Sequence, residues 1–535
     1  MEPAARASLA QGAAASSIVT AISRLTGFVR VVVVAGAMGT TFLANTYQTA
    51  NTLPNLVFEL LAAGVLTSVF VPTFVQYLAT ERRDEGWAAA NALGSVALVG
   101  LVVLSGVLAL LARPLMMLLT IAVENDSVRT AEVNLGTTFL RLFAPQVALY
   151  GAGMIMTGAL HAHRRFVLPA AAPIFNNVCV IAVYLTYASM RGGESPSVGG
   201  ITTGQTLVLG IGTTIGVAAM TLALVPSLLR LGWRPRWSFK PRHAAVKQAG
   251  RLGVWALGYA GGYQAGLIVV LLLANRVEGG VAAYQWAYTF FYMPHALFGV
   301  PIFNVLFTAM SEQVALRRDE DLLETMRDGL GMLAFILVPV AAGLIALSGP
   351  LATVTLEYGV MSGAGAALVA RVLLAFAIGL PSYSAFLVFT RAFYARGDTK
   401  TPAIVNAITV GLASAIGATL FVLFPEEWKV AGLALGHSTA FVIGTILLAR
   451  AFTSRAGAIG GTRLNTSLRR IGAAGFVALG AMVLITGIWG TADRGSALLD
   501  LAVTGTVGIL AYIGAAAGMK APELKRLAAV TRLAR

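Results

Sequence analysis

The sequence predicts an all-α polytopic membrane protein with fourteen transmembrane helices and both termini in the cytoplasm. Two global observations support this fold class: only 11% of the 535 residues are charged, and the mean hydropathy is +0.79. Soluble domains usually carry about 25% charged residues. A third observation is that apolar stretches of about twenty residues, enough to cross roughly 30 Å of hydrocarbon, recur along the whole chain. No stretch remains for a soluble enzyme domain.

Apolar runs bounded by polar residues define the predicted spans. They lie at 14–38, 42–78, 88–112, 135–160, 167–188, 205–229, 252–275, 281–310, 328–348, 366–390, 402–423, 430–449, 471–489 and 498–518. The second run is too long for one straight helix, and Pro54 predicts a break in it because proline removes a backbone donor. The first run is long and contains two arginines, so we expect it to be retained rather than cleaved as a signal peptide.

The basic residues provide a test of this topology. With the N-terminus in the cytoplasm, 28 of the 38 Lys and Arg residues fall in inside segments, six fall in outside loops and four fall in or beside spans. Cytoplasmic loops of membrane proteins carry this excess of positive charge. The net charge of +15 is therefore explained by membrane topology, and no nucleic-acid partner is predicted.

Two basic turns with similar sequences indicate an internal repeat. LHAHRRFVLPAAAPIFNN (160–177) and TRAFYARGDTKTPAIVNA (390–407) each join two predicted spans and lie six spans apart. The repeat predicts two six-helix lobes, at 1–235 and 236–460, followed by two further helices and a basic tail at 461–535. Transporters built from repeats bind substrate between their halves. Chance similarity between two basic loops is the alternative.

The first span, SIVTAISRLTGFVRVVVVAGAMG, carries the residues that point to an anionic ligand. Arg24 and Arg30 each cost about 2.5–3.5 kcal/mol at a helix centre, so a compensating partner is expected. They lie about 120° apart around a helix, and Ser23 is nearly in line with Arg30. Gly27 allows close approach of a ligand, and paired guanidinium groups suit a pyrophosphate. In the alternative, Arg24 extends to the interface and Arg30 pairs with a structural carboxylate.

The second span contains NTLPNLVFELL, in which three residues are of interest. If the helix breaks at Pro54, Asn55 can cap the new helix start, and such a start attracts anions. Glu59 follows one turn later at membrane depth. We expect Glu59 either to pair with Arg24 or Arg30 or to be a proton or cation site.

The remaining reactive residue types predict no metal, no cofactor and no enzymatic activity. The single cysteine, Cys179, excludes an intramolecular disulfide and a cysteine-based metal site. GDTKT (397–401) lacks the glycines of a phosphate-binding loop, and no GxxxxGK[ST] motif is present. Four histidines without metal-like spacing are interpreted as interfacial: His161, His163, His295 and His437.

An ordered set of motifs resembles one family of transporters. The set comprises SRLTGFVR (23–30), LPN (53–55), FVP (70–72), RFVLPAAAP (165–173), SGPL (348–351) and FYARGDTKTP (393–402). In this order the motifs resemble the MurJ/MviN family of lipid II flippases, in particular its actinobacterial branch, within the multidrug/oligosaccharidyl-lipid/polysaccharide exporter superfamily. The resemblance implies a V-shaped pair of lobes and a groove for the lipid tail formed by helices 13 and 14.

The resemblance also carries over to individual residues. The serine and the two arginines of the family's first helix fall on Ser23, Arg24 and Arg30. Four other family positions differ here and are occupied by Asn45, Phe58, Thr289 and Gly417. Phe58 and Thr289 replace arginines, and the asparagine of a sodium site falls near Gly417, so the cavity is expected to be less basic. The predicted substrate-binding residues are Ser23, Arg24, Gly27, Arg30, Asn45, Pro54, Asn55 and Glu59.

The predicted function is therefore to flip lipid II, an undecaprenyl-pyrophosphate-linked disaccharide-pentapeptide, across the bacterial cytoplasmic membrane by alternating access. The cell-wall synthesis or division machinery would supply its protein partners. Three alternatives remain: a flippase for another polyprenyl-pyrophosphate glycan, a drug or cation antiporter of the same superfamily, and a non-transporting cell-wall scaffold.

Overall fold

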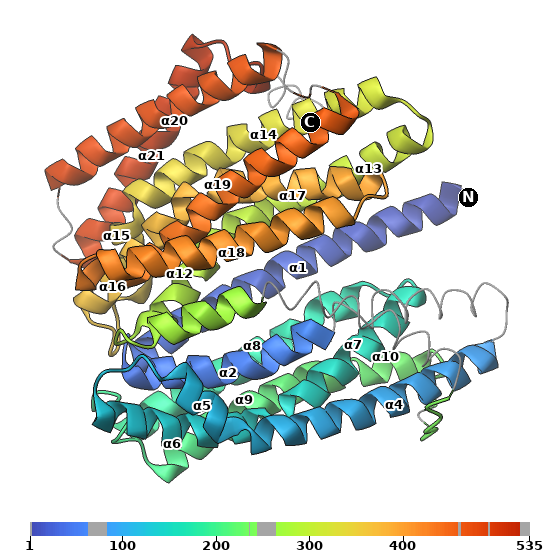
Figure 1. The fold of residues 1–535 in the computed structure, drawn as a ribbon, viewed down its shortest axis with the longest axis vertical. Helices are drawn as coiled ribbons and strands as arrows, with labels where there is room; N and C mark the ends of the chain where they lie inside the picture. Colours follow the sequence, from blue (N-terminus) through green and yellow to red (C-terminus); the bar gives the residue numbers. More distant parts are fainter. Residues whose placement is uncertain are drawn as a thin grey trace. The chain divides into compact units, whose positions relative to one another are not determined.

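The computed structural model describes residues 3–61, 83–234, 236–242, 264–457, 459, 462–489 and 493–524, and this part of the chain is almost entirely helical. It forms two compact units, Met1–Val281 and Ala282–Arg535. The first unit contains α1 (Pro3–Met38), α2 (Phe42–Leu61), α4 (Arg83–Leu110), α5 (Ala112–Leu119), α6 (Asp126–Phe143), α7 (Gln146–Ala162), α8 (Val167–Arg191), α9 (Thr203–Leu222), α10 (Val225–Arg230) and the helix Gln264–Ala274 (Figure 1).

The second unit begins within α12 (Gly280–Pro294). A five-residue π-helix, His295–Gly299, joins α12 to α13 (Val300–Ala315). The unit continues with α14 (Asp319–Ala346), α15 (Ser348–Leu356), α16 (Gly363–Ile378), α17 (Leu380–Ala395), α18 (Lys400–Leu423), the short η3 (Glu426–Trp428), α19 (Lys429–Ala456), α20 (Thr462–Trp489) and α21 (Arg494–Gly518).

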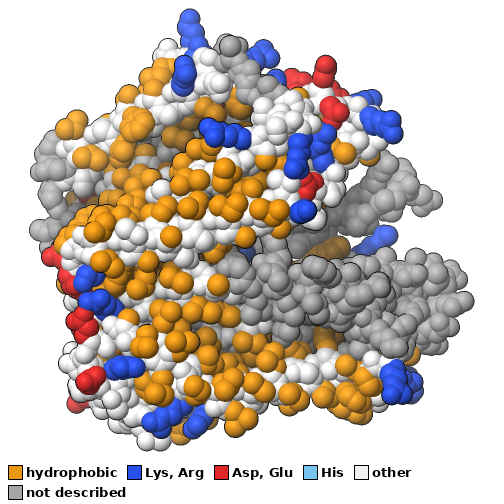
Figure 2. Space-filling model, viewed as in Figure 1, with side chains coloured by type: hydrophobic (Ala, Val, Ile, Leu, Met, Phe, Trp, Pro, Cys, Tyr) orange, Lys and Arg blue, Asp and Glu red, His pale blue; other side chains and the backbone are white. Residues whose placement is uncertain are grey.

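Helix composition agrees with a membrane environment. Among the described residues, ten helices are long and apolar enough to cross a bilayer, or twelve if two bent pairs each form one span. The bent pairs are Gly94–Leu110 with Ala112–Leu119, at 58°, and Gly363–Ile378 with Leu380–Ala395, at 46°. Figure 2 shows hydrophobic side chains along the helices and charged side chains gathered near helix ends. This distribution is the one that a lipid bilayer selects.

The break predicted at Pro54 is absent. The α2 helix runs without interruption from Phe42 to Leu61 and contains Pro54, which is buried. Asn55 does not cap a new helix start; its Nδ2 donates to the carbonyl oxygen of Asn51 at 3.0 Å. Proline is tolerated inside membrane helices because neighbouring side chains compensate for the lost backbone bond. The remainder of the predicted span 42–78 lies outside the described residues.

The two basic turns from which the internal repeat is predicted have the same backbone geometry. After α7, Arg164 has φ +58° and the Arg165 amide donates to the carbonyl of Leu160 at 2.8 Å. After α17, Gly397 has φ +76° and the Asp398 amide donates to the carbonyl of Phe393 at 3.0 Å. Each helix therefore ends at a residue with left-handed backbone geometry, and the amide of the next residue donates to the carbonyl five residues before it. This helix ending is the Schellman motif.

Hydroxyl groups provide a second, independent match between the units. In the first unit, Thr214 and Thr221 of α9 donate to the carbonyls of Leu142 (2.8 Å) and Leu149 (3.0 Å). In the second unit, α19 does the same, with Ser438 donating to Ala375 (2.7 Å) and Thr445 to Ser382 (2.8 Å). In each unit the donors are seven residues apart and the acceptors are also seven residues apart. Side chains one heptad apart lie on one helix face. One face of α9 is therefore bonded to both α6 and α7, and one face of α19 to both α16 and α17.

The first compact unit extends to Val281. The segment before α12 is held by the first unit through polar contacts. The amide of Asn275 hydrogen-bonds Thr49 (3.1 Å) and the carbonyl of Leu119 (3.2 Å). Gly279, at φ +69°, packs so tightly on Thr40 that a Cβ atom would approach it to 2.3 Å. The predicted division into parts 1–235, 236–460 and 461–535 remains a prediction.

The last two helices pack within the second unit. The α20 and α21 helices contact each other and α14, and the Tyr512 hydroxyl donates to the carbonyl of Phe335 at 2.8 Å. Their outer faces are apolar: Phe476 is 76% exposed and Leu484 is 71% exposed. Exposed apolar residues of this size are expected to face lipid.

Candidate functional site

Arg30 faces a group of hydroxyls inside the first unit. Its side chain is half-buried on α1. The guanidinium lies close enough to Tyr47 of α2, Tyr150 of α7 and Tyr184 of α8 to interact with them electrostatically. The Tyr47 hydroxyl lies 3.1 Å from that of Tyr184 and 2.6 Å from that of Thr213. Arg30 therefore lies beside a connected chain of hydroxyl groups from neighbouring helices.

Ser23 and Gly27 lie on the face of α1 that contacts α8. The Asn177 amide donates to the carbonyl of Ser23 (3.3 Å) and to the Thr26 hydroxyl (3.0 Å). Ser23 is only 9% exposed, and a Cβ atom at Gly27 would make ordinary contact with the Asn177 amide at 3.5 Å. The Ser23 backbone thus contributes to helix packing, and Gly27 lies in the same contact with α8, where the space would also accept a Cβ atom.

Arg24 lies on a different side of the same helix. Its side chain is exposed, whereas that of Arg30 is half-buried. Six residues of straight helix place the two about 9 Å apart along the axis and about 120° apart around it. The structure therefore separates the two arginines into one on the packed side of α1 and one on its exposed side.

Asn55 and Phe58 of α2 line the same region as Arg30. The Asn55 side chain lies close to the Tyr150 hydroxyl, and the ring of Phe58 lies 5.1 Å from that of Tyr150. Through Tyr150, the structure brings Arg30 and Asn55 together at one hydroxyl.

Glu59 has a different partner from the one predicted. The side chain of Gln264, in the helix Gln264–Ala274, donates to Glu59 Oε2 at 2.7 Å. The sequence predicts either a pairing with Arg24 or Arg30 or a proton or cation site, and the structure places the neutral amide of Gln264 beside Glu59. Glu59 is exposed, so water can solvate its charge and no cation is required for that purpose.

Asn45 is fully buried, and both polar atoms of its side chain form hydrogen bonds. Its Nδ2 donates to the carbonyl of Val277 at 2.8 Å, and its Oδ1 accepts from the backbone amide of Val281 at 3.0 Å. In this conformation Asn45 joins the start of α2 to the segment before α12. Its role in the structure is to position these elements.

The second unit contains an aromatic cluster with two of the four histidines. His295 is 1% exposed, and its Nδ1 lies 2.8 Å from the Ser384 hydroxyl. The His437 ring lies 4.6 Å from the Phe441 ring and 5.9 Å from the Tyr383 ring. The interfacial interpretation is therefore wrong for both histidines, because each is packed among aromatic rings where these helices meet.

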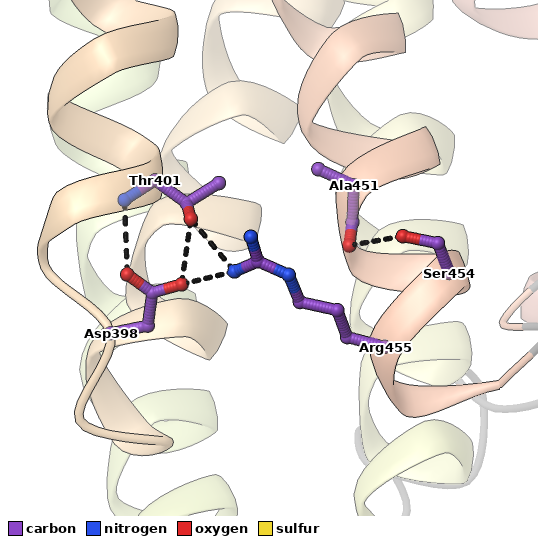
Figure 3. Close-up of polar contacts among 5 residues, drawn as sticks. All are labelled: Asp398, Thr401, Ala451, Ser454 and Arg455. Atoms are coloured by element: carbon purple, nitrogen blue, oxygen red, sulfur yellow. Dashed lines mark hydrogen bonds and ion pairs between the residues drawn. The ribbon is translucent and has the colours of Figure 1, made fainter.

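The GDTKT turn (397–401) has a structural role. Asp398 accepts hydrogen bonds from the backbone amide (2.9 Å) and the hydroxyl (2.7 Å) of Thr401, and also from Arg455 (Figure 3). Arg455, near the end of α19, also donates to the Thr401 hydroxyl at 2.7 Å. Asp398 thus joins the start of α18 to the end of α19. The backbone amide and the hydroxyl of Thr401 are thus already bonded within the protein.

Comparison with known protein families identifies the chain. The family described as lipid II flippase MurJ matches residues 34–500. The chain belongs to this family.

Curated MurJ-family proteins resemble the chain over most of its length. A probable lipid II flippase MurJ from Vibrio cholerae serotype O1 is 28% identical over 517 residues, covering 93% of this chain and 94% of that protein. A probable lipid II flippase MurJ from Rhizobium meliloti is 27% identical over 431 residues, covering 80% of this chain and 77% of that protein.

Solved structures agree on the fold. A lipid II flippase MurJ in an inward closed conformation matches with a TM-score of 0.73 at 20% identity, covering 94% of this chain and 97% of that one. An inward-facing MATE family transporter of the MOP superfamily matches with a TM-score of 0.65 at 14% identity, covering 83% and 99%. The chain is thus a multi-pass transporter of the cytoplasmic membrane with the fold of this superfamily, and it is not an enzyme.

Several polar residues of this MurJ-family chain are absent from the predicted set of site residues. Tyr150, Asn177 and Gln264 contact predicted site residues, yet each is ordinary in an apolar span. Glu132 is a stronger omission, because it is 0% exposed within α6. The predicted span began at residue 135, so Glu132 was counted as part of a loop. Extending the predicted helix toward the N-terminus beyond its apolar run would include Glu132.

Proposed function

We propose that the chain flips lipid II from the inner to the outer leaflet of the cytoplasmic membrane for peptidoglycan synthesis. The observation that carries this proposal is the match of the MurJ family over residues 34–500. Among the alternatives, this match favours lipid II over another polyprenyl-linked glycan, a drug or cation, and over a scaffolding role.

The chemistry around Arg30 supports binding of a pyrophosphate. A guanidinium offers a planar fork of donors that bonds two phosphate oxygens at once. Neighbouring hydroxyls, such as that of Tyr150, can donate further hydrogen bonds. We assign Arg30 and Arg24 to the pyrophosphate and Asn55 and Glu59 to the polar part of the headgroup.

The other predicted site residues have supporting roles in this proposal. Ser23 and Gly27 hold α1 against α8 and so determine where Arg30 points. Asn45 anchors the start of α2, and Pro54 shapes the helix that carries Asn55. These four residues would act through the position of the binding groups.

Fourteen spans, with both termini in the cytoplasm, remain part of the proposal. The ten long apolar helices and two bent pairs supply twelve spans. The helix α2 and the helix Gln264–Ala274 adjoin stretches outside the described residues and would contribute the second and seventh spans. The charge bias of 28 inside to six outside supports this count.

We further propose that transport follows alternating access. The headgroup would pass through the polar interior of the protein while the lipid tail stays in the bilayer, next to the apolar faces of α20 and α21. An ion or voltage gradient, or consumption of lipid II outside, would drive the cycle. A monovalent cation moving through 100 mV releases about 2.3 kcal/mol. Proteins of cell-wall synthesis or division are the expected partners.

The experiment that tests the proposed function measures flipping directly. The purified protein is placed in vesicles with fluorescent lipid II in the inner or outer leaflet, and leaflet exchange is followed by quenching from outside. Lipid II should move, whereas a polyprenyl-pyrophosphate with an unrelated glycan should move far more slowly. Equal transport of both lipids, or transport of neither, would contradict the assignment.

A further inference from the structure

Glu132 is a buried carboxyl group that the proposed binding site does not use. It lies in α6, six residues after Asp126 begins the helix, and is 0% exposed. At 1.5 Å per residue it is about 9 Å from the end of the helix predicted to be outside. Its Oε2 has no hydrogen-bond partner among the described residues, and its Oε1 lies 3.1 Å from the Thr46 hydroxyl of α2.

The hydrogen bonds of Thr46 indicate where the proton lies. The Thr46 hydroxyl is 2.8 Å from the carbonyl oxygen of Phe42 and 3.1 Å from Glu132 Oε1. A hydroxyl has one proton to donate, and a carbonyl oxygen and an ionised carboxylate can only accept. An ionised Glu132 would have to share the single Thr46 proton with the carbonyl of Phe42 in a bifurcated bond. A protonated Glu132 instead gives each of the two contacts its own proton, because Thr46 then donates to Phe42 and Glu132 donates to Thr46.

The surroundings of Glu132 contain no compensating cation among the described residues. The helices packed against α6 are α2, α4, α5 and α9. The titratable residues of α2 are Tyr47, which is bonded to Thr213, and Glu59, which is bonded to Gln264. The α5 helix offers Arg113, which is exposed, and α9 offers no titratable residue. The charged residues of α4 are confined to its first three positions, 83–85.

The remaining charged residues on α6 also leave Glu132 uncompensated. They are Asp126, Arg129 and Arg141, and within the described part of the chain neither arginine forms an ion pair with Glu132. An isolated ionised carboxylate is very unfavourable in such an environment, so the neutral form is retained while water is excluded.

We propose that Glu132, with Thr46, is a proton-binding site of the first unit. In the present conformation the carboxyl group holds its proton and donates it to Thr46. When α2 and α6 separate enough to admit water, the O–H bond breaks, the proton passes to water and the carboxylate remains. Closure takes a proton back. On the proposed flippase function, this step would couple the conformational cycle to a proton gradient.

Infrared difference spectroscopy tests proton binding without any lipid substrate. The purified wild-type protein should show the C=O stretching band of a buried, protonated carboxylic acid at neutral pH. Glu132→Gln should remove this band, while Glu194→Gln, which changes an exposed loop carboxylate, should leave it intact. A band unchanged in Glu132→Gln, or absent from the wild type, overturns the proposal.

A second variant covers the case in which Glu132→Gln does not fold. Thr46→Val keeps the carboxyl group and removes its hydrogen-bond acceptor, so the same band should move to higher frequency. Thr46→Ser, which restores the hydroxyl, should return the band to its wild-type position. An unshifted band in Thr46→Val would show that the observed acid is not bonded to Thr46, and the proposed site would be wrong.

Transport measurements separate this inference from the proposed function. Lipid II flipping by the wild type should respond to a pH gradient by at most about tenfold per pH unit, the limit for one proton. Glu132→Gln should abolish this response, and Glu194→Gln should retain it. A response to a sodium gradient alone would overturn proton coupling. If the wild type flips no lipid II, the proposed function fails, and the infrared result still decides whether the proton site exists.

Discussion

Arg30 links the membrane helix α1 to the polar groups of three neighbouring helices. Its side chain is half-buried and lies near Tyr47, Tyr150 and Tyr184. Tyrosine hydroxyls do not neutralise a positive charge, so the group is suited to an anionic ligand. Arg24, with an exposed side chain, differs from Arg30 in this respect. Of the two arginines, Arg30 should therefore have the larger effect on substrate binding.

We predict that Arg30→Ala lowers lipid II affinity by about 10- to 100-fold, because hydrogen bonds to a charged group contribute about 1.5–3 kcal/mol. Arg30→Lys should lose less, since it keeps the charge but not the bidentate fork. Arg113→Ala, at an exposed position on α5, is the matched control. Binding of lipid II to the purified variants measures the effect. Wild-type affinity in Arg30→Ala would remove this residue from the site.

Asp398 should make stability depend on pH at the turn between α17 and α18. Burial raises its pKa, but the hydrogen bonds from Thr401 and the charge of Arg455 outweigh that effect and hold the pKa below its ordinary value. A lowered pKa stabilises the folded protein above the unfolded value of about 3.9. That stabilisation is lost as the pH falls through the folded pKa.

Accordingly, Asp398→Asn should lower the melting temperature at neutral pH, and its difference from the wild type should shrink below about pH 4. Asp321→Asn, which removes an exposed carboxylate paired with Arg318 at 3.9 Å, should have little effect. Thermal unfolding in detergent across this pH range measures both. A constant difference between Asp398→Asn and the wild type at every pH would contradict the assigned role.

At the scale of elements, α18 and α19 cross at very short range. Gly436 of α19 lies so near α18 that an added Cβ atom would approach the backbone nitrogen of Gly417 to 2.4 Å. In the family resemblance, the asparagine of a sodium site falls near Gly417. The close crossing accounts for a glycine at this position. Small residues that let backbones approach are a common basis of helix association in membranes.

We predict that Gly436→Ala destabilises the protein by about 1–3 kcal/mol, since backbone atoms cannot move aside as a side chain can. Gly411→Ala on α18 is the control, because a Cβ atom there meets nothing within 4 Å. That substitution should be neutral or slightly stabilising, as alanine favours helix by about 0.5–1 kcal/mol. Unfolding in detergent compares the two. Equal stability of both variants would mean that the crossing is looser than the structure has it.

The whole-molecule prediction concerns topology. Seven predicted spans separate Ser197, in the loop before α9, from Ser454, at the end of α19, so the two should lie on opposite sides of the membrane. In a Cys179→Ala background, a membrane-impermeant maleimide should label Ser197→Cys in intact cells. It should label Ser454→Cys only after permeabilisation. Labelling of both from the same side would contradict the fourteen-span topology.

Family membership and membrane character could be read from the sequence because they depend on local or ordered features. A predicted span reflects the average composition of about twenty adjacent residues. The charge bias depends on which loop a basic residue occupies, and the family motifs depend on their order. None of these features requires knowledge of which helices touch.

The partners of polar residues depended on tertiary structure, because they come from distant parts of the chain. Glu59 is bonded to Gln264, 205 residues away, and Glu132 lies beside Thr46, 86 residues away. Composition cannot indicate which helix faces a carboxyl group, although that neighbour decides whether the group keeps its proton. The continuity of α2 through Pro54 has a similar cause, since surrounding helices compensate for the lost backbone bond. The sequence thus determined a membrane transporter of the MurJ family, and only helix packing decided the environment of each polar side chain.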